Sequence, residues 1–399
     1  MFPRQILNAL LDDLARPHIR MLGKRRSSFH ICGVTGLTLF VVEGVLLTAY
    51  RSLSLEVWAV LALLAVAVFL ALPMIGKILT GEERLTSLHH KGSVLAAAAS
   101  LLWLLGQPVL AYLDMLILSV GLFVACGRVG CLMVGCCHGR PHHWGVCYRQ
   151  EHAAAGFTPY FVGVRLVPVQ IVESLWVFAI VTVGNIVVLN GGAPGQALAW
   201  YALSYCAGRF LFEFLRGDAA RPFYGGFSQP QWSCLVVLAL VGLAGPAGFL
   251  PFQPWHPLPA AGVAAAMGAV SLRRRFSGND RHLLLHPRHI REIATILKKI
   301  DKESSPKPDA SAPSCNSLAV DVGCSSLGIQ ISGGEVGEKG RRMQHYALSQ
   351  KGGALEAPKG RMLAELILLL KHHRGPSEFV KGGRDVFHLM LPIPTARNR

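Results

Sequence analysis

The sequence predicts an all-α polytopic membrane protein of about seven transmembrane helices, followed by a small α+β soluble C-terminal module. Of its 399 residues, 52% are hydrophobic and only 16% are charged, whereas a soluble domain carries about 25% charged residues. Several apolar runs reach the roughly 20 residues that a helix needs to cross a bilayer. After the last of these runs the composition becomes polar and basic, which predicts a separate soluble part.

The apolar runs define a membrane domain over residues 28–272. We expect seven spans, at Phe29–Tyr50, Leu55–Ile75, Ser93–Tyr112, Met115–Cys136, Pro168–Leu189, Gly195–Leu215 and Trp232–Phe252. A shorter run, Ala260–Leu272, is either an eighth span or the far end of the seventh. Gly245, Pro246 and Pro251 interrupt this region, and proline cannot continue a regular helix.

Basic residues flank the membrane domain. The net charge is +16, residues 1–27 form a basic N-terminal arm, and Arg273–Arg275 directly follow the last apolar run. Positive residues at the ends of spans usually mark the cytoplasmic side and attract anionic lipid headgroups. Nucleic-acid binding is the other interpretation of a basic chain, and the position of these charges at the membrane boundary argues against it.

The C-terminal part divides into a basic helix with a linker, residues 273–317, and a module, residues 318–399. Residues 286–302 predict an amphipathic helix on the membrane surface, with its apolar face at Ile290, Ile293, Ile296 and Leu297. The module has a β-β-α-β pattern. Its expected strands are Leu327–Ile331, His345–Ser349 and Val386–Ile393, and its helix is Arg361–His372.

Ionisable residues inside the apolar runs are the candidate functional groups, because charges at membrane depth are costly and usually functional. Tyr205, Arg209, Glu213 and Arg216 are spaced four, four and three apart, which places them on one face of a helix. The alternative is an Arg–Glu pair that locks two helices together, with Arg216 as an interfacial anchor.

Two further positions suit an anionic ligand. Arg128 lies within an apolar run between Gly127 and Gly130, and arginine binds phosphate in a bidentate manner. Gln170 and Glu173 share a face where another span begins; the alternative is an ordinary polar helix entry.

Three of the ten cysteines lie in one segment, GRVGCLMVGCCHGRP, which begins at Gly127. Cys131, Cys136, Cys137 and His138 are a possible thiol site, with three interpretations: zinc binding, a redox pair or lipid-carrying thiol, and close helix packing. Their spacing differs from the usual C-x-x-C pair, and adjacent cysteines rarely bind one metal. We therefore predict neither a metal nor a cofactor.

The motifs resemble those of the prolipoprotein diacylglyceryl transferase family, over about residues 28–272. The matching stretches, in the family's order, are HKG at His90–Gly92, GRVG at Gly127–Gly130, PVQIVE at Pro168–Glu173, YCAGRFLFEFLR at Tyr205–Arg216 and SQPQ at Ser228–Gln231. The resemblance implies a seven-span protein of the bacterial inner membrane. It also implies transfer of a diacylglyceryl group from phosphatidylglycerol to a cysteine thiol of a lipobox-type preprotein.

The resemblance also implies roles for individual residues. His90 would take the thiol proton, and Arg128 and Arg209 would stabilise the leaving glycerophosphate. Glu213 would orient Arg209, and Tyr205 would contact the substrate. The expected substrate-binding residues are Arg216, Gln170, Glu173, Gly127, Gly130, Ser228 and Gln231.

The chain departs from the family pattern at three positions. The family's arginine motif continues with asparagine and then glutamate, where this sequence has Cys131 and Cys136. The family's HGG motif is HKG in this sequence, with Lys91 in place of the first glycine. These departures predict a divergent member with an altered substrate or different chemistry.

The charge pattern and the resemblance predict different orientations. The basic arm predicts a cytoplasmic N-terminus, whereas the resemblance implies an external N-terminal arm, seven spans and a cytoplasmic C-terminal module. We follow the resemblance.

Two other functions fit the sequence. The long C-terminal extension suits a non-enzymatic domain that binds or senses an anionic lipid and reports to the soluble module. The cysteines suit a thiol or metal carrier.

Overall fold

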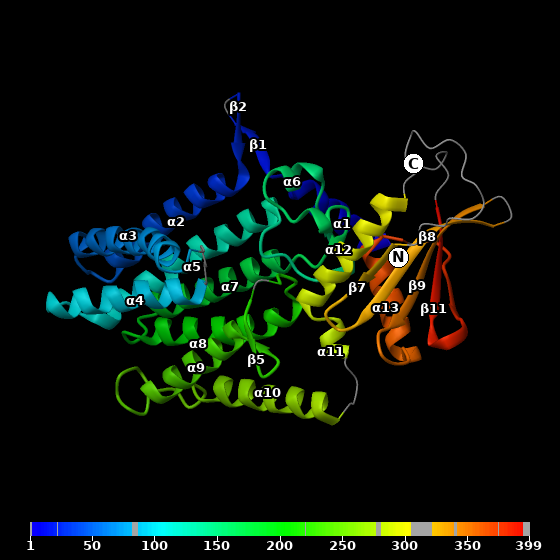
Figure 1. The fold of residues 1–399 in the computed structure, drawn as a ribbon. Coiled ribbons are helices and arrows are strands. Elements are labelled where there is room, and N and C mark those ends of the chain that lie inside the picture. Colours follow the sequence, from blue (N-terminus) through cyan, green and yellow to red (C-terminus); the bar gives the residue numbers. More distant parts are fainter. Residues whose placement is uncertain are drawn as a thin grey trace.

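The fold combines a helix bundle with an α+β module at one end of it (Figure 1). The structure is a computed structural model that describes residues 2–21, 23–81, 87–219, 221–276, 281–304, 321–338, 341–373 and 375–393. The bundle helices are α2 (Ser28–Tyr50), α3 (Leu55–Thr80), α4 (Ser87–Leu104), α5 (Val109–Val134), α7 (Val169–Leu189), α8 (Gln196–Phe212), α9 (Gln229–Ala244) and α10 (Leu258–Phe276).

The structure confirms a mostly helical membrane protein. Among the described residues, four helices are long and apolar enough to cross a membrane: α2, α3, α5 and α7. The predicted span Ser93–Tyr112 is wrong in its bounds, because α4 ends at Leu104 and α5 already begins at Val109. Gly106 has a φ of +63° and Pro108 precedes α5, so this turn divides what appeared as continuous apolar sequence.

Helix α5 is the centre of the bundle and packs against α2, α7 and α8. Its contact with α2 is close because glycines face cysteines there. A Cβ at Gly36 would lie 3.0 Å from Cys126 Cβ, and one at Gly130 would lie 3.1 Å from Cys32 Cβ. At the far end, the Asp114 carboxylate accepts hydrogen bonds of 2.7 Å from the backbone N–H groups of Gly195 and Leu198, which ties α5 to α8.

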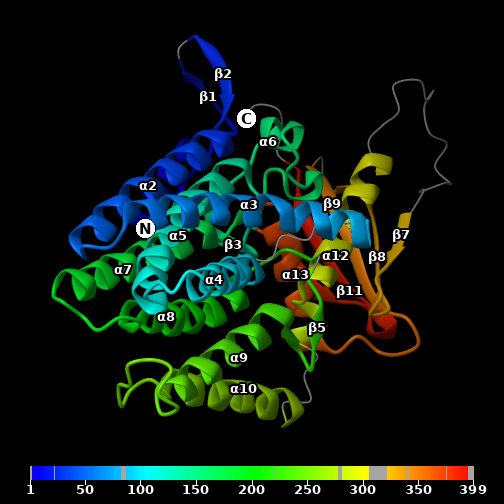
Figure 2. The same cartoon turned by 90° about the vertical axis from the view of Figure 1, so that its left-hand side faces the viewer.

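Helix α10 is a separate helix that runs back along α9, and both figures show the two side by side (Figures 1 and 2). The Arg274 guanidinium near its end donates a 2.7 Å hydrogen bond to the Gly226 carbonyl, which lies just before α9 begins. The run Ala260–Leu272 is therefore not the far end of the preceding helix.

The N-terminal arm is folded. It contains α1 (Phe2–Leu14) and a hairpin of β1 (His18–Met21) and β2 (Lys24–Ser27). Helix α1 packs on a small two-stranded sheet of β3 (Pro141–Cys147) and β4 (Arg165–Leu166). The Arg165 guanidinium binds both carboxylate oxygens of Asp12, at 3.1 and 2.8 Å.

The C-terminal module is a five-stranded antiparallel sheet in the order β10-β11-β9-β8-β7. The strands are β7 (Asp321–Cys324), β8 (Ile329–Glu338), β9 (Arg341–Gln350), β10 (Glu378–Lys381) and β11 (Phe387–Pro392). Two helices accompany them, α12 (Pro287–Ser304) and α13 (Ala357–Leu370). The predicted helix and three strands are present; β7 and β10 are additional.

The membrane-surface prediction for residues 286–302 is wrong. Ile290, Ile293 and Leu297 of α12 are 3%, 0% and 2% exposed, and they share an apolar core with the module's sheet. An apolar helical face has the same sequence pattern whether it meets lipid or a sheet, so only the packing decides between them.

Helix α1 and the C-terminal module lie at the same end of the bundle (Figure 1). Leu11 of α1 and Leu166 of β4 belong to the same apolar core as Ile293 and Leu363 of the module. The expectation that the N-terminal arm and the C-terminal module lie on opposite sides of the membrane is therefore wrong. The separate return helix α10 brings the module back to the end where the arm lies.

Candidate functional site

A single buried carboxylate is the centre of the candidate site. Glu173, in the first turns of α7, is 4% exposed. Its oxygens lie 2.8 Å from Arg128 Nε, 3.3 Å from an Arg209 terminal nitrogen and 3.4 Å from an Arg216 terminal nitrogen. Three guanidiniums, one from α5 and two from the end of α8 and the chain just after it, therefore share one carboxylate.

Two more carboxylates and a fourth guanidinium extend this centre. Glu213 lies 2.6 Å from Arg209 and also pairs with Arg221. Asp218 bridges Arg216 at 3.0 Å and Arg221 at 2.8 Å. We call these seven residues the arginine–carboxylate cluster: Arg128, Glu173, Arg209, Glu213, Arg216, Asp218 and Arg221. Its four guanidiniums face three carboxylates, so one positive charge is left uncompensated within it.

The predicted one-face stripe is correct for its helical part and wrong at its end. Helix α8 ends at Phe212, and Glu213–Leu215 form a 3-10 turn. Arg216 is extended, with φ −75° and ψ 142°, and forms an isolated β-bridge with Gly139. Arg216 reaches Glu173 because the chain leaves the helix, which the spacing of a continuous helix did not predict.

Asp218 lies in the loop after Arg216, outside the bundle helices. Burial raises its pKa, but the neighbouring guanidiniums of Arg216 and Arg221 outweigh this and lower the pKa to about 2. The carboxylate is therefore ionised at neutral pH and holds both arginines in place.

A second group of polar side chains lies between α4 and α8. Lys91 is buried; its ammonium lies 3.0 Å from the Tyr205 ring centroid and 3.4 Å from the Tyr201 hydroxyl. The rings of Tyr201 and Tyr205 stack with centroids 5.7 Å apart. Tyr205, predicted to contact substrate, thus lies beside Lys91, which the sequence analysis did not assign.

His90 precedes Lys91 on α4, which packs against α5, the helix of Arg128. The imidazole is buried and meets the Phe69 ring edge-on at a centroid distance of 5.5 Å. The predicted base therefore lies on a helix next to the one that carries the predicted phosphate-binding arginine.

Several predicted substrate-binding residues make structural contacts in this fold. Ser228 and Gln231 form a capping box at the start of α9, and this reciprocal bonding satisfies the first N–H groups of the helix. Gly130 faces α2. Gln170 donates a 2.8 Å hydrogen bond to the Cys136 carbonyl. This bond anchors residues 135–140 between α5 and β3, which we call the cysteine loop. Gly127 has open space around its Cα position.

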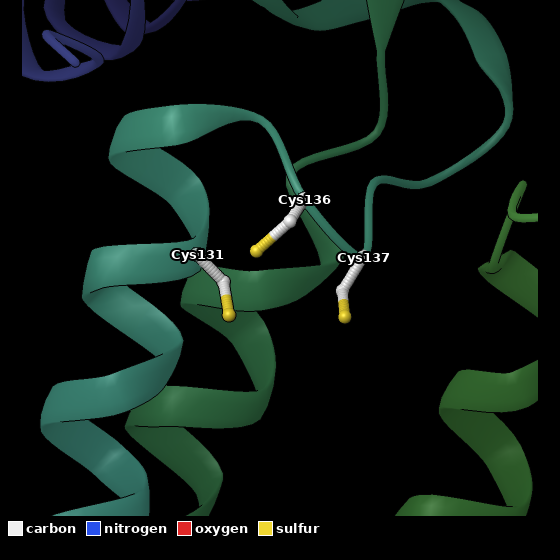
Figure 3. Close-up of side chains that lie close together, drawn as sticks. All are labelled: Cys131, Cys136 and Cys137. Atoms are coloured by element: carbon white, nitrogen blue, oxygen red, sulfur yellow. The ribbon is translucent and has the colours of Figure 1, made fainter. Parts of the chain in front are cut away.

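The three cysteine thiols of the opening motif converge (Figure 3). The Sγ atoms of Cys131, Cys136 and Cys137 all lie within 4.8 Å of one another. His138, predicted in the same site, does not join them. Its Nδ1 is 2.9 Å from the Gly139 carbonyl oxygen, and its ring packs edge-on against Phe157 and Phe161.

The cysteine loop is fixed to the strands and loops around the cluster. The Gly139 N–H donates to the Val167 carbonyl at 3.1 Å, and the Arg140 N–H donates to the Leu215 carbonyl at 3.0 Å. The Gly217 N–H donates to the His138 carbonyl at 3.0 Å. These bonds place the thiols beside the entry to α7 and the exit from α8.

Sequence reasoning missed Asp218 and Arg221. Both follow the last apolar residue of α8 in the stretch GDAAR, and there they looked like ordinary loop residues. They lie two and five residues after Arg216, but only the folded loop brings Asp218 to Arg216 and Arg221 to Glu213.

The chain is similar to known proteins over its central part. The sequence model described as prolipoprotein diacylglyceryl transferase matches residues 86–245. Curated relatives named phosphatidylglycerol–prolipoprotein diacylglyceryl transferase include those of Clostridium tetani (33% identical over 28% of this chain and 43% of the relative) and Dehalococcoides mccartyi (32% identical over 41% and 61%). A second such enzyme of Clostridium perfringens is 31% identical over 33% of this chain and 49% of the relative.

The chain spans about half the length of these curated relatives. The matched region contains the whole arginine–carboxylate cluster, the cysteine loop and His90. With these residues, the central part of the chain is similar to the prolipoprotein diacylglyceryl transferase family.

Proposed function

We propose that this protein is a phospholipid-dependent transferase of a bacterial inner membrane. It moves a diacylglyceryl group from phosphatidylglycerol, or a similar anionic phospholipid, to a protein cysteine thiol. The observation that carries the proposal is the sharing of Glu173 by Arg128, Arg209 and Arg216. The uncompensated positive charge of that cluster suits the single negative charge of a phosphodiester.

The acceptor thiol must be deprotonated before it attacks. A cysteine thiol has a pKa near 8.5, and its thiolate is the nucleophile. His90 is the proposed base, as the family motif implies, because a neutral imidazole accepts a proton near pH 7. The thiolate then forms a C–S bond to the glycerol carbon that bears the phosphate.

The C–O bond to the phosphate breaks in the same step, and its electron pair stays on the leaving glycerophosphate. Negative charge therefore grows on the phosphate in the transition state. Arg128 and Arg209 are proposed to stabilise it, since fixed guanidiniums in a site shielded from water lower the energy of such charge. Glu213, 2.6 Å from Arg209, orients that guanidinium.

The cysteines at positions 131 and 136 support the finer proposal of a divergent variant. An asparagine and a carboxylate of the family pattern are absent there, and three thiols meet instead. The acceptor is accordingly either a lipobox-type prolipoprotein or another protein that exposes a cysteine.

The direct test uses purified protein with labelled phosphatidylglycerol and a lipobox peptide. We expect a thioether product detected by mass spectrometry, and its loss in Arg128→Ala. Arg275→Ala, an exposed residue at the end of α10, is the matched control and should keep full activity. Absence of product, while an authentic family enzyme is active in parallel, would contradict the proposal.

One observation favours a second function, a lipid-sensing domain without catalysis. Arg288 of α12 donates hydrogen bonds to the carbonyls of Ala219 and Arg221, at 3.3 and 3.0 Å. The module therefore touches the loop that carries two residues of the cluster. Phosphatidylglycerol would then change amide exchange in the module without any product. Unchanged exchange in wild type, or an equal change in Arg209→Ala, would exclude this function.

A further inference from the structure

The convergence of three thiols is the feature that the proposed mechanism does not use. A zinc ion with Zn–S bonds of about 2.3 Å holds its sulfur ligands roughly 4 Å apart. The Sγ atoms of Cys131, Cys136 and Cys137 already lie within 4.8 Å of one another, and Figure 3 shows them gathered between the end of α5 and the following loop. Small rotations of the side chains would bring all three to bonding distance of one ion.

Two residues in the left-handed backbone conformation turn the chain so that the three thiols meet. Gly135, the C-cap of α5, has a φ of +84°, and Cys137 has a φ of +54°. The left-handed backbone conformation costs a residue with a Cβ about 1–2 kcal/mol. Such strain is typical of functional sites, and the hydrogen bond from Gln170 to the Cys136 carbonyl helps to hold it.

The thiols lie beside the arginine–carboxylate cluster. Arg216 forms an isolated β-bridge with Gly139, two residues after Cys137, and Arg128 lies three residues before Cys131 on α5. These two guanidiniums supply positive charge next to the site, which offsets the negative charge of thiolates, the form that binds metal.

The number of ligands indicates the type of site. Structural zinc sites have four protein ligands, whereas sites with three keep a position open for an exchangeable ligand. His138 is turned toward Gly139 and two phenylalanine rings, and the possible metal group among the described residues contains the three cysteines alone. Cys136 is exposed, which leaves the site accessible from outside the bundle.

We propose that Cys131, Cys136 and Cys137 bind one zinc ion through three thiolates, with the fourth position open. In a further step, which rests on the proposed function, the acceptor cysteine occupies that position as a thiolate. Zinc deprotonates a coordinating thiol, and the proton passes to His90 or water. The acceptor sulfur then forms the C–S bond and leaves the metal.

The first experiment measures bound metal in the intact protein. Protein produced with zinc in the medium and purified without chelator should contain one zinc per chain by elemental analysis. The Cys137→Ser variant should contain at least tenfold less zinc per chain. Cys324→Ser changes an exposed thiol far from the loop in sequence and should retain the metal. Wild type without zinc, or Cys137→Ser with unchanged zinc, would overturn the proposal.

A second experiment on wild type removes any doubt about folding of the variant. Alkylation followed by peptide mass mapping should show Cys131, Cys136 and Cys137 protected by zinc and reactive after chelation. Cys324 should react equally in both samples. Equal labelling of the three thiols with and without zinc, or a disulfide between two of them in protein purified without oxidant, would count against a metal site.

These readouts are independent of lipid transfer. Bound zinc with no thioether product would leave the metal site standing and contradict the transferase. Product formation that is equal in zinc-loaded and chelated protein would contradict the role of zinc toward the acceptor thiol, even with stoichiometric metal.

Discussion

Glu173 has two roles in the arginine–carboxylate cluster. It neutralises part of the charge of three buried guanidiniums, and it keeps them converged around one point. Arg209 and Arg216 each have a further carboxylate, in Glu213 and Asp218. Arg128 meets Glu173 through Nε, so its terminal nitrogens are the donors best placed for an anionic ligand.

Glu173→Gln is expected to destabilise the protein strongly. It leaves buried guanidiniums without their shared charge, and breaking a buried pair in this way costs about 3–5 kcal/mol. Thermal unfolding in detergent should show a clear fall in Tm, and transferase activity should be lost. Glu56→Gln, at an exposed site in the first turn of α3, is the control. An unchanged Tm would mean that the cluster does not depend on Glu173.

The ionisation of Asp218 makes the stability of the folded protein depend on pH in the acid range. Its pKa is about 2 in the folded protein and 3.8 ordinarily, so its ionised form stabilises the fold. This contribution, on the order of 2 kcal/mol, is fully present above about pH 4. It is lost as the pH falls toward 2. Unfolding midpoints of wild type and Asp218→Asn should therefore differ by a constant amount above pH 4 and converge below it. Parallel curves down to pH 2 would refute this.

At the scale of elements, the cysteine loop links the ends of α5, α7 and α8. Gly139 lies where the loop crosses the chain before α7. A Cβ there would lie 2.3 Å from the Val167 carbonyl oxygen. The backbone on both sides is hydrogen-bonded and cannot retreat easily.

Gly139→Ala should therefore displace the loop from Arg216 and reduce activity at least tenfold. The clash is with backbone, so the cost is above 1 kcal/mol, as for other overpacking changes. Product formation and Tm are the measurements. Gly268→Ala in α10, where a Cβ meets nothing within 4 Å, should leave both unchanged. Wild-type activity in Gly139→Ala would show that the loop adapts.

At the scale of the whole molecule, the soluble module and the bundle form one unit. The module shares an apolar core with α1 and with the sheet of β3 and β4, and Arg288 binds the carbonyls of the Asp218–Arg221 loop. The C-terminal module is thereby joined, at the candidate site, to the region that is similar to the transferase family.

Arg288→Ala should loosen this connection. The variant removes two hydrogen bonds between the module and the loop, so the module should become more sensitive to limited proteolysis and activity should fall roughly tenfold. Lys299→Ala, on the exposed side of α12, is the control. If Arg288→Ala matches it in both assays, the contact has no role in positioning the loop.

The orientation of the chain is the second prediction at this scale. Reporters fused to the two termini should lie in the same compartment, because arm and module share one end of the bundle. Arg51 is the one Lys or Arg in the described loops at the other end, so the positive-inside rule predicts the cytoplasm for both termini. Reporters in opposite compartments would contradict the packing of α1 against the module end.

The sequence by itself determined the class of protein, the approximate positions of the helices and three of the four arginines of the arginine–carboxylate cluster. Apolar length and helical spacing are local properties, and they are sufficient to locate α2, α3, α5 and α7. The motifs around Arg128 and Arg209 likewise pointed to the family that the comparisons support.

Only the tertiary structure decided which charges meet. Glu43, a lone acid in the sequence, has its partner on another helix, at 2.7 Å from Asn185. The burial of α12, the turning of Arg216 toward Glu173 and the meeting of three thiols are likewise long-range results. The physical reason is that an ion pair or an apolar face takes its partner from the packing of distant segments, and local spacing does not specify those segments.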